Sequence, residues 1–511
     1  MGRKICRFPL GEGPAQLRKI LRSHTGGIDL SFLDSMRPCH KGEQSRHSKP
    51  PSTLPCHYTV SNLQWRGLQG NFAPNFHSML PDFLSSQRVQ RLLTALYIAA
   101  VAAYGTVVVY LRGPRFRDFD WHREIGRWFL TGQDLYSNPV SYPYMPTGAM
   151  YFSLLALVDR STGMAIRYTA AVICLWLTCV LFHRMIEGQF QELAHANPLL
   201  SVITIVLAGQ FILYDLDDGG PHTILLGMLV GAVYAVWKGR ENLGAIWFGL
   251  AIALKVTPGL FLPFFMWKRQ WRLALYTAVS TVCWIILPIV WMGPASWWSH
   301  QQTWAQVAVG SALGYKTQFA QANEDNIRNS GIQPALMRYL VTLPPDHPLR
   351  KNDPGYVEIL DLPPAHARIL IFLAITVLLY GFFWCTRQPY RGPGDPEWPR
   401  ECSGLLILML FLSPLTWIQH LPWLVPALYW IVAKACSSDG LSHLSKVAMG
   451  LYVMIAIVLN YEVLGKQNFL VFLSFKPFTI GMLLIFAVLM LQSQKAGTLS
   501  HGPVHNTAYA K

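Results

Sequence analysis

The sequence predicts an all-α polytopic membrane protein. Of its 511 residues, 52% are hydrophobic and only 14% are charged, whereas soluble globular proteins average about 25% charged residues. The formal net charge of +15 would suggest nucleic acid as a partner of a soluble protein. Here, however, Lys and Arg collect in short loops, as they do on the cytoplasmic side of membrane proteins. No zinc-ligand spacing, RNP motif or helix-turn-helix pattern accompanies them, so we expect no nucleic-acid partner.

The two ends of the chain are predicted to lie outside the membrane domain. Residues 1–90 are basic, rich in Pro, Ser, His and Gly, and have no sustained hydrophobic periodicity, which is typical of disordered segments. No apolar segment follows Arg3–Arg7, so this stretch does not resemble a cleavable signal peptide. Met79 is an alternative start, which would exclude residues 1–78 from the protein. We expect residues 1–90 to be a cytoplasmic extension and residues 493–511 to be a short cytoplasmic tail.

Apolar runs between these ends predict about twelve transmembrane helices with both termini in the cytoplasm. A helix needs about 20 residues to cross about 30 Å of hydrocarbon, and several runs are shorter. We expect residues 146–158 to lie at, or dip into, the outer surface rather than to span. The runs are 92–111, 164–182, 199–214, 221–237, 242–254, 257–267, 273–292, 367–385, 403–413, 418–433, 444–461 and 477–491.

This topology gathers the informative polar residues on the external side, away from cytoplasmic nucleotides. No P-loop or dinucleotide-binding fingerprint is present in the sequence to contradict that arrangement. The predicted external segments are 113–163, 215–221, the turn at Lys255, 293–366, the turn at residues 413–417 and the loop 462–476.

The first external loop, residues 113–163, carries two carboxylates, Asp118 and Asp120, at the start of an amphipathic stretch. A carboxylate can remove the proton of an acceptor hydroxyl as a general base. Residues two apart on a helix point to different faces, so we expect only one of the two to reach a site. Asp118 is the first choice for the base and Asp120 the second. We expect one side of this helix to be buried, with Trp121, Trp128 and Phe129, and the other to face solvent or headgroups, with His122, Arg123, Glu124 and Arg127.

Two helical hairpins turn close to the outer surface and carry one ionisable residue each. Lys255 lies at the first turn and His420 follows the second. Thirteen helical residues rise only about 20 Å, so both turns should stop below the outer headgroups. A lysine and a histidine at that depth are costly unless they meet an anion, and a lipid phosphate is the simplest such partner. The alternative is that Lys255 snorkels to the surface and His420 is a satisfied core residue.

Four motifs in the same order resemble glycosyltransferase family 87. An Asp-Phe pair, a Gly-x-Asp-x-Tyr turn and a Tyr-Pro segment come first, followed by Gly-Leu…Lys-x-x-Pro, a degraded Asn…Arg stretch and Ser-Pro…Trp-x-x-His. They stand here at 118–119, 132–136 and 142–146, at 249–258, at 329–338 and at 412–420.

The resemblance implies a GT-C fold over residues 91–492 and an inverting transfer from a polyprenyl-phosphate sugar, as in mycobacterial mannosyltransferases of the family. It gives Asp118 the role of general base and places Lys255 and His420 at the donor phosphate, with Arg338 a weaker candidate. The acceptor would be a glycan or glycolipid. Accessory roles fall to Asp120, Asp218, His222, Tyr136 and Asn329.

We expect no cofactor and no metal ion. The Asp118-x-Asp120 spacing is found in metal-dependent nucleotide-sugar enzymes, but two carboxylates alone make a poor metal cage. Lys, Arg and His can neutralise a leaving lipid phosphate instead. The resemblance implies a multi-pass plasma (inner) membrane protein whose active site faces the extracytoplasmic side.

Several alternatives stay open at the sequence level. A transporter or flippase of lipid-linked sugars would bind the same ligands without chemistry, although paired repeats and midplane charges, typical of transporters, are not evident. A ligase or polymerase of lipid-linked glycans would take an oligosaccharide donor. The acidic turn at residues 215–222 departs from the family pattern, and it is either a solvated loop or a sugar contact.

Overall fold

The computed structural model describes residues 87–111, 118–136, 144–306, 327–343, 357 and 359–492. Every regular element within these residues is helical, which confirms the all-α prediction. The predicted extension 1–90, except for its last four residues, and the predicted tail 493–511 lie outside the described residues. So do the Tyr142–Pro143 part of the first-loop motif and parts of the long external segment 293–366.

The first part of the chain forms helices that alternate with short turns. They are α3 (Gln87–Thr106), η1 (Val107–Leu111), α4 (Asp118–Thr131), α5 (Pro146–Ala156), α6 (Arg160–Ile186), η2 (Gln191–Leu193), α7 (Asn197–Leu207), α8 (Gly209–Asp218), α9 (His222–Trp237), α10 (Glu241–Leu254), η3 (Thr257–Leu260), α11 (Phe261–Trp267), α12 (Trp271–Ile286), α13 (Ile289–Met292) and α14 (Pro294–Trp304).

The second part continues in the same way after residue 326. Its helices are α17 (Ile332–Leu340), α19 (Pro364–Cys385), α20 (Glu397–Leu412), η5 (Ile418–Leu424), α21 (Val425–Cys436), α22 (His443–Val453), η6 (Met454–Val458), α23 (Tyr461–Ser474) and α24 (Pro477–Leu491).

Membrane-spanning length is met by three described segments, Arg160–Ile186, Trp271–Met292 and Pro364–Cys385. Two bent helix pairs raise this number to as many as five if each pair is one span. α9, α10 and α24 are apolar but shorter. The count of about twelve spans therefore stays a prediction, as does the GT-C fold.

The structure differs from three of the segments predicted from the sequence. The apolar run 199–214 is not one straight helix, because α7 and α8 meet at an angle of 73°. The acidic segment at 215–218 is not a turn but the last turn of α8. The predicted loop 462–476 is mostly α23. Its polar residues lower the local hydropathy, yet Phe469 and Leu473, four residues apart, are both buried and give the segment a packed helical face.

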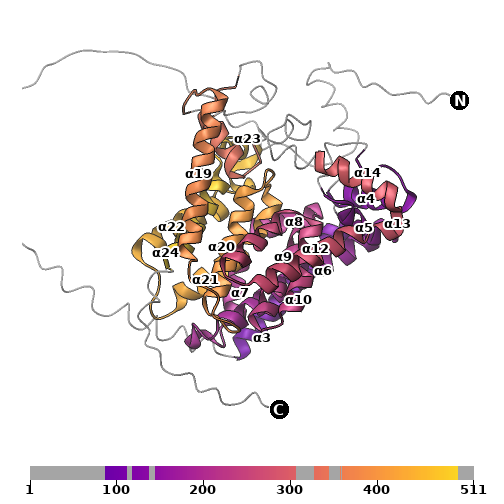
Figure 1. Ribbon diagram of the computed structural model, residues 1–511. Helices are drawn as coiled ribbons and strands as arrows, with labels where there is room; N and C mark the ends of the chain where they lie inside the picture. The colour runs from indigo at the N-terminus through magenta and orange to yellow at the C-terminus, as the bar shows by residue number, and fades with distance from the viewer. Residues whose placement is uncertain are drawn as a thin grey trace, which may run out of the picture. The chain divides into compact units, whose positions relative to one another are not determined.

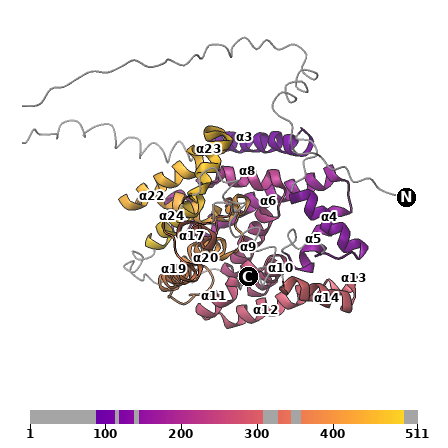
Figure 2. The ribbon, with the colours of Figure 1, turned by 90° about the horizontal axis from the view of Figure 1, so that it is seen from above.

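The helices that frame the candidate site are neighbours in space although they are distant in sequence. α6 packs on α9, α9 on α10, and α10 on α12. α4 lies on α5, and α14 contacts α5 at the same end of this group (Figures 1 and 2). The short 3-10 segment η5 contacts α8, α9 and α20. η5 therefore lies against both α8 and α9.

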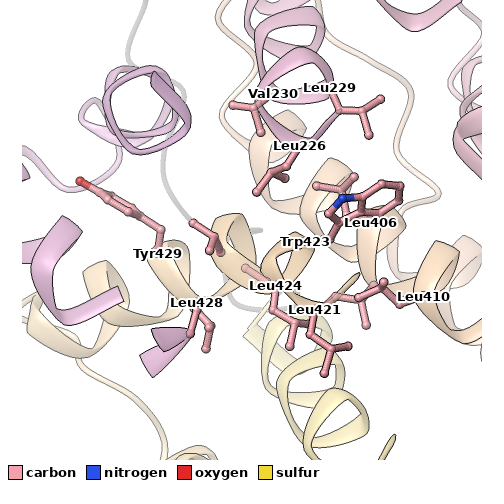
Figure 3. Close-up of a cluster of buried hydrophobic side chains, with 14 of the residues drawn as sticks. Leu226, Leu229, Val230, Leu406, Leu410, Leu421, Trp423, Leu424, Leu428 and Tyr429 are labelled. Carbon is pink, nitrogen blue, oxygen red and sulfur yellow. The ribbon is translucent and has the colours of Figure 1, made fainter. Parts of the chain in front are cut away.

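A buried apolar cluster anchors η5 against its neighbours. Trp423 and Leu421 come from η5, and they lie beside Leu226 of α9 and Leu406 of α20 (Figure 3). The indole N–H of Trp423 also donates to the carbonyl of His222 at 3.1 Å. Close packing of this kind leaves little freedom to the backbone, so the polar residues of η5 are held in one position.

The prediction for α4 is correct for Phe129, which is buried, whereas Trp121 and Trp128 are only partly buried, and one residue expected on the solvated side is buried. Phe119, Ile125 and Phe129 are buried, at the spacing of one helical face. His122 was expected on the solvated side but is only 5% exposed. Its ring stacks on Phe152 of α5 with centroids 4.1 Å apart, because α5 covers the helix face on which His122 lies.

Candidate active site

Asp118 is the first residue of α4 and is partly buried. A carboxylate at a helix N-terminus is favoured by the unpaired backbone N–H groups there. Gln419 of η5 donates a long hydrogen bond from Nε2 to Asp118 Oδ2, at 3.4 Å. The same Nε2 donates to Asp218 Oδ2 at 3.2 Å. Three segments that are far apart in the sequence thus meet at one side-chain amide.

Lys255, His222 and His420 form a second polar group close to this one. Lys255 Nζ lies 3.5 Å from His222 Nδ1, and the rings of His222 and His420 are 4.1 Å apart between centroids. Lys255 Nζ also lies 5.6 Å from the ring centroid of Trp423. His420 Nδ1 accepts the backbone N–H of Trp417 at 3.2 Å. Since that nitrogen is an acceptor, the neutral imidazole of His420 carries its proton on Nε2, where it can donate.

A buried ion pair holds the end of α8 that carries Asp218. Arg167 of α6 is 2% exposed, and its guanidinium lies 3.2 Å from the carboxylate of Asp215, which is fully buried. Arg167 also donates to the carbonyl oxygens of Leu216 and Gly220. The alternative that the acidic segment is a solvated loop is therefore wrong for Asp215.

The turn between α8 and α9 lies directly against α4. Gly219 has φ = +83°, in the left-handed region that favours glycine. A Cβ at this position would lie 2.4 Å from Cβ of Phe119. Because Phe119 follows Asp118, this close approach sets how near Asp118 comes to α8.

Asp120 points away from the group around Gln419. Its two carboxylate oxygens accept hydrogen bonds from Arg160, at 2.6 and 2.8 Å. Arg160 is the first residue of α6, so Asp120 ties the first external loop to the start of that helix. The two carboxylates of the Asp-x-Asp pair thus face different partners.

The other residues singled out from the sequence have partners of their own. Asn329 accepts the N–H of Thr416 at 3.0 Å and donates to the carbonyl of Pro414 at 2.9 Å, so it holds the turn that precedes η5. Arg338 donates to the carbonyl of Ser474 at 3.0 Å. Tyr136 donates to the carbonyl of Tyr144 at 2.8 Å within the first external loop. Arg338 thus contacts the last residue of α23, and Tyr136 contacts the segment just before α5.

A small apolar pocket, partly open to solvent, lies beside Lys255. Lys255 is the charged residue of its lining, and the other walls come from the first external loop, α5, α9 and the end of α10. They include Tyr144, Tyr151, Phe152, Ile224, Leu225 and Leu254. A cavity of this composition suits a molecule with an anionic group at one end and an apolar body.

Burial controls the protonation of the ionisable side chains on α4. Burial raises the pKa of Asp118 above the ordinary 3.8, and Asp215 adds to this, while the Gln419 hydrogen bond, Arg167 and Lys255 act in the opposite direction. Burial lowers the pKa of His122 to about 3, as do the nearby cations Arg167 and Lys255. His122 is therefore a neutral imidazole at physiological pH.

Two of the residues that build this site were not singled out from the sequence. Gln419 occupies a variable position of the Trp-x-x-His motif, so the motif alone gave it no role. Arg167 is a lone arginine inside an apolar helix, which is by itself a signal of function or of a buried partner. That signal was available and was missed. Within the described part of the chain, no three His, Cys, Asp or Glu side chains form a group that could hold a metal ion.

Comparison with known proteins gives the family. The model of glycosyltransferase family 87 matches residues 142–414, which include Lys255 and Asn329, whereas Asp118 and His420 lie on either side of this range. No solved structure is significantly similar to the chain.

Two curated relatives share the description "polyprenol-phosphate-mannose-dependent alpha-(1-2)-phosphatidylinositol mannoside mannosyltransferase". The chain is 22% identical to the one from Mycolicibacterium smegmatis over 342 residues, covering 62% of this chain and 70% of the relative. It is 24% identical to the one from Mycobacterium tuberculosis over 358 residues, covering 65% and 74%. Since the family model matches more than half of its residues, the chain belongs to glycosyltransferase family 87.

Proposed function

We propose that this chain transfers a hexose, namely mannose, from a polyprenyl-phosphate donor to a hydroxyl of a glycan or glycolipid acceptor. The reaction inverts the anomeric carbon and needs no metal ion. Asp118 is the general base, and Lys255, His420 and His222 bind the donor phosphate. The site faces the extracytoplasmic side of the membrane.

The observation that carries this proposal is the meeting of Asp118 with the Lys255 group at the ends of α8 and α9. Lys255 and His222 lie within 3.5 Å of each other, and His420 lies against His222. Gln419, the residue before His420, contacts Asp118. A base and a cationic group in one place are the two parts that a transfer from a lipid phosphate requires.

The base acts on the acceptor. The acceptor hydroxyl oxygen attacks the anomeric carbon while its proton passes to the carboxylate of Asp118. The new glycosidic C–O bond forms as the bond from the anomeric carbon to the phosphate oxygen breaks. Attack from the side opposite the phosphate inverts the configuration. A positioned base of this kind contributes roughly 10²–10⁴-fold to the rate.

The cationic group acts on the donor. As the sugar leaves, negative charge grows on the lipid phosphate, and donors aimed at that charge stabilise the transition state. The ammonium group of Lys255 supplies a cation, and the Nε2–H of His420 supplies a neutral donor. The apolar side chains beside Lys255 then lie against the first isoprene unit of the lipid, while the phosphate stays at Lys255.

The proposed donor and acceptor are of the kind that the descriptions of the relatives name. Both are described as depending on polyprenol-phosphate-mannose and as acting on a phosphatidylinositol mannoside. A lipid-linked donor is consistent with an apolar cavity that ends at a lysine. We therefore expect the acceptor to be a glycolipid rather than a soluble sugar.

The test is a transfer assay with purified protein in lipid nanodiscs, radiolabelled polyprenyl-phosphate-mannose and a phosphatidylinositol mannoside. We expect Asp118→Asn to reduce transfer at least 100-fold while donor binding and the melting temperature stay close to those of the wild type. Asp120→Asn is the matched control, because Asp120 bonds Arg160 instead. It should retain most of the activity.

Transfer by Asp118→Asn at the wild-type rate would show that Asp118 is not the general base. Equal loss of transfer in Asp118→Asn and Asp120→Asn would point to a damaged loop rather than to a missing base. Absence of transfer by the wild type from polyprenyl-phosphate-mannose, with transfer from an oligosaccharide diphosphate, would replace the proposed donor.

A further inference from the structure

One side-chain amide joins the two carboxylates of the site. Gln419 Nε2 lies 3.4 Å from Asp118 Oδ2 and 3.2 Å from Asp218 Oδ2. An amide –NH₂ group has two hydrogens, so it can serve one carboxylate with each. The two aspartates are 100 residues apart in the chain, and Gln419 is the group through which they are linked.

Gln419 is well placed to hold a fixed position. It is 6% exposed and lies in η5, between the Trp417–His420 cap and the buried Trp423. Asn329 holds the turn just before η5. Because both ends of the segment are anchored, the backbone at Gln419 is held in place.

The charges around Asp118 make this amide important. Asp215 and Asp218 on α8 are like charges. Arg167 on α6 and Lys255 after α10 are opposite charges, and both are shared with other partners. His122 on α4 is neutral, and Tyr144 before α5 is a buried phenol. A neutral donor that serves both Asp118 and Asp218 lets them lie close together without adding a further charge.

We propose that Gln419 is the positioning residue of the transfer reaction: its shared amide keeps Asp118 ionised beside Asp218 and orients the Asp118 carboxylate toward the acceptor hydroxyl. This inference rests on the proposed role of Asp118 as general base. It assigns Gln419 no contact with the substrate. Substitution of Gln419 should therefore change kcat and the pH profile more than it changes the KM for the donor.

The first experiment replaces the amide by a carboxylate of the same shape. Gln419→Glu brings a third like charge next to Asp118 and Asp218 and removes both donors. We expect kcat at neutral pH to fall at least tenfold and the acid limb of kcat/KM to move up by about one pH unit or more. The KM for the donor should change less than about threefold. Gln419→Leu, which removes the donors without adding charge, should lower kcat with a smaller shift of the limb.

The decisive control exchanges the two groups. Asp218→Asn with Gln419→Glu again gives two carboxylates and one amide at the same three positions, with the amide now on α8. We expect this double variant to move the acid limb part of the way back toward the wild-type position, because the number of carboxylates is restored, while kcat stays low, because Asp118 still has no amide donor at position 419. A residue that only fills space would show neither the shift of the limb nor its partial return. Melting temperatures of all variants identify any that fail to fold. If Gln419→Glu fails to fold, Gln419→Leu still tests the role of the amide.

The outcomes separate this inference from the proposed function. If Asp118→Asn is inactive but the acid limb of Gln419→Glu matches the wild type and the kcat of Gln419→Leu is unchanged, the positioning role is wrong and the base assignment stands. The positioning role is also wrong if the exchanged double variant has the wild-type kcat, because Asp118 would then need no donor at position 419. If Asp118→Asn itself remains active, the proposed function fails first.

Discussion

Replacing Arg167 by methionine tests whether the buried clamp at the end of α8 holds the site together. Arg167 pairs with the fully buried Asp215 at 3.2 Å. It also bonds the carbonyl oxygens of Leu216 and Gly220. Removing one partner of a buried ion pair costs about 3–5 kcal/mol, because the other charge is left buried and unpaired. We expect Arg167→Met to lower the free energy of unfolding by that amount, and Asp215→Asn by a similar amount.

The double variant gives the sharper test. With Arg167→Met and Asp215→Asn together, no charge is left unpaired, so the loss should be smaller than the sum of the single losses by about 1–3 kcal/mol. The free energy would be measured by denaturant titration of the protein in detergent micelles. Arg160→Met is the matched control, since the Arg160–Asp120 pair is partly exposed and such pairs contribute about 0–1 kcal/mol. Two results would refute the role of the Arg167–Asp215 pair. One is a loss of unfolding free energy in the single variants that is no larger than in Arg160→Met, and the other is a loss in the double variant equal to the sum of the single losses.

Three further outcomes follow from the site. Lys255→Met should lower kcat by about 10²–10³-fold in the transfer assay, with Lys255→Arg less impaired, and equal activity of the two would argue against a cation at the phosphate. The pKa of Asp118 is raised by burial, and a general base works only when ionised. The rate kcat/KM should therefore fall as the pH drops through that raised pKa, at a pH above 3.8, and a limb at or below 3.8 in a pH series would contradict this. Asn329→Ala leaves the buried N–H groups of Thr416 and Gly331 unpaired, which should cost about 1–3 kcal/mol of stability in a denaturant titration. An unchanged unfolding midpoint would show that the turn does not need this side chain.

The helices were largely predictable from the sequence because burial leaves a local pattern. Apolar runs gave the positions of most of them, and the amphipathic pattern of α4 gave Phe129 correctly as a residue of its buried face. Bends and polar helices were harder to predict. The break between α7 and α8 has no proline, and α23 has polar residues in its first turns. A glycine is present in both places, Gly209 at the start of α8 and Gly465 inside α23, but an isolated glycine is only a weak local signal. Packing against other parts of the chain then decides whether the helix bends or continues.

The site was predictable only in part, for the same reason. Asp118, Lys255 and His420 stand out because charged or polar groups in apolar surroundings are costly and therefore informative. His122 carried no such signal, since the amphipathic pattern of α4 placed it with the solvated residues until α5 covered that face. Gln419 is uncharged and common, and its role depends on two carboxylates that are 301 and 201 residues away in the chain. A contact over that distance cannot be read from spacing.

The bare backbone at Gly219 makes two distant parts of the chain sterically dependent on each other. A Cβ at this position would lie only 2.4 Å from Cβ of Phe119, so α4 can lie against the end of α8 only because no side chain stands there. A graft that carries a foreign α4 into this protein would therefore have to keep the shape that Gly219 accommodates. The two positions that must match are 100 residues apart in the chain.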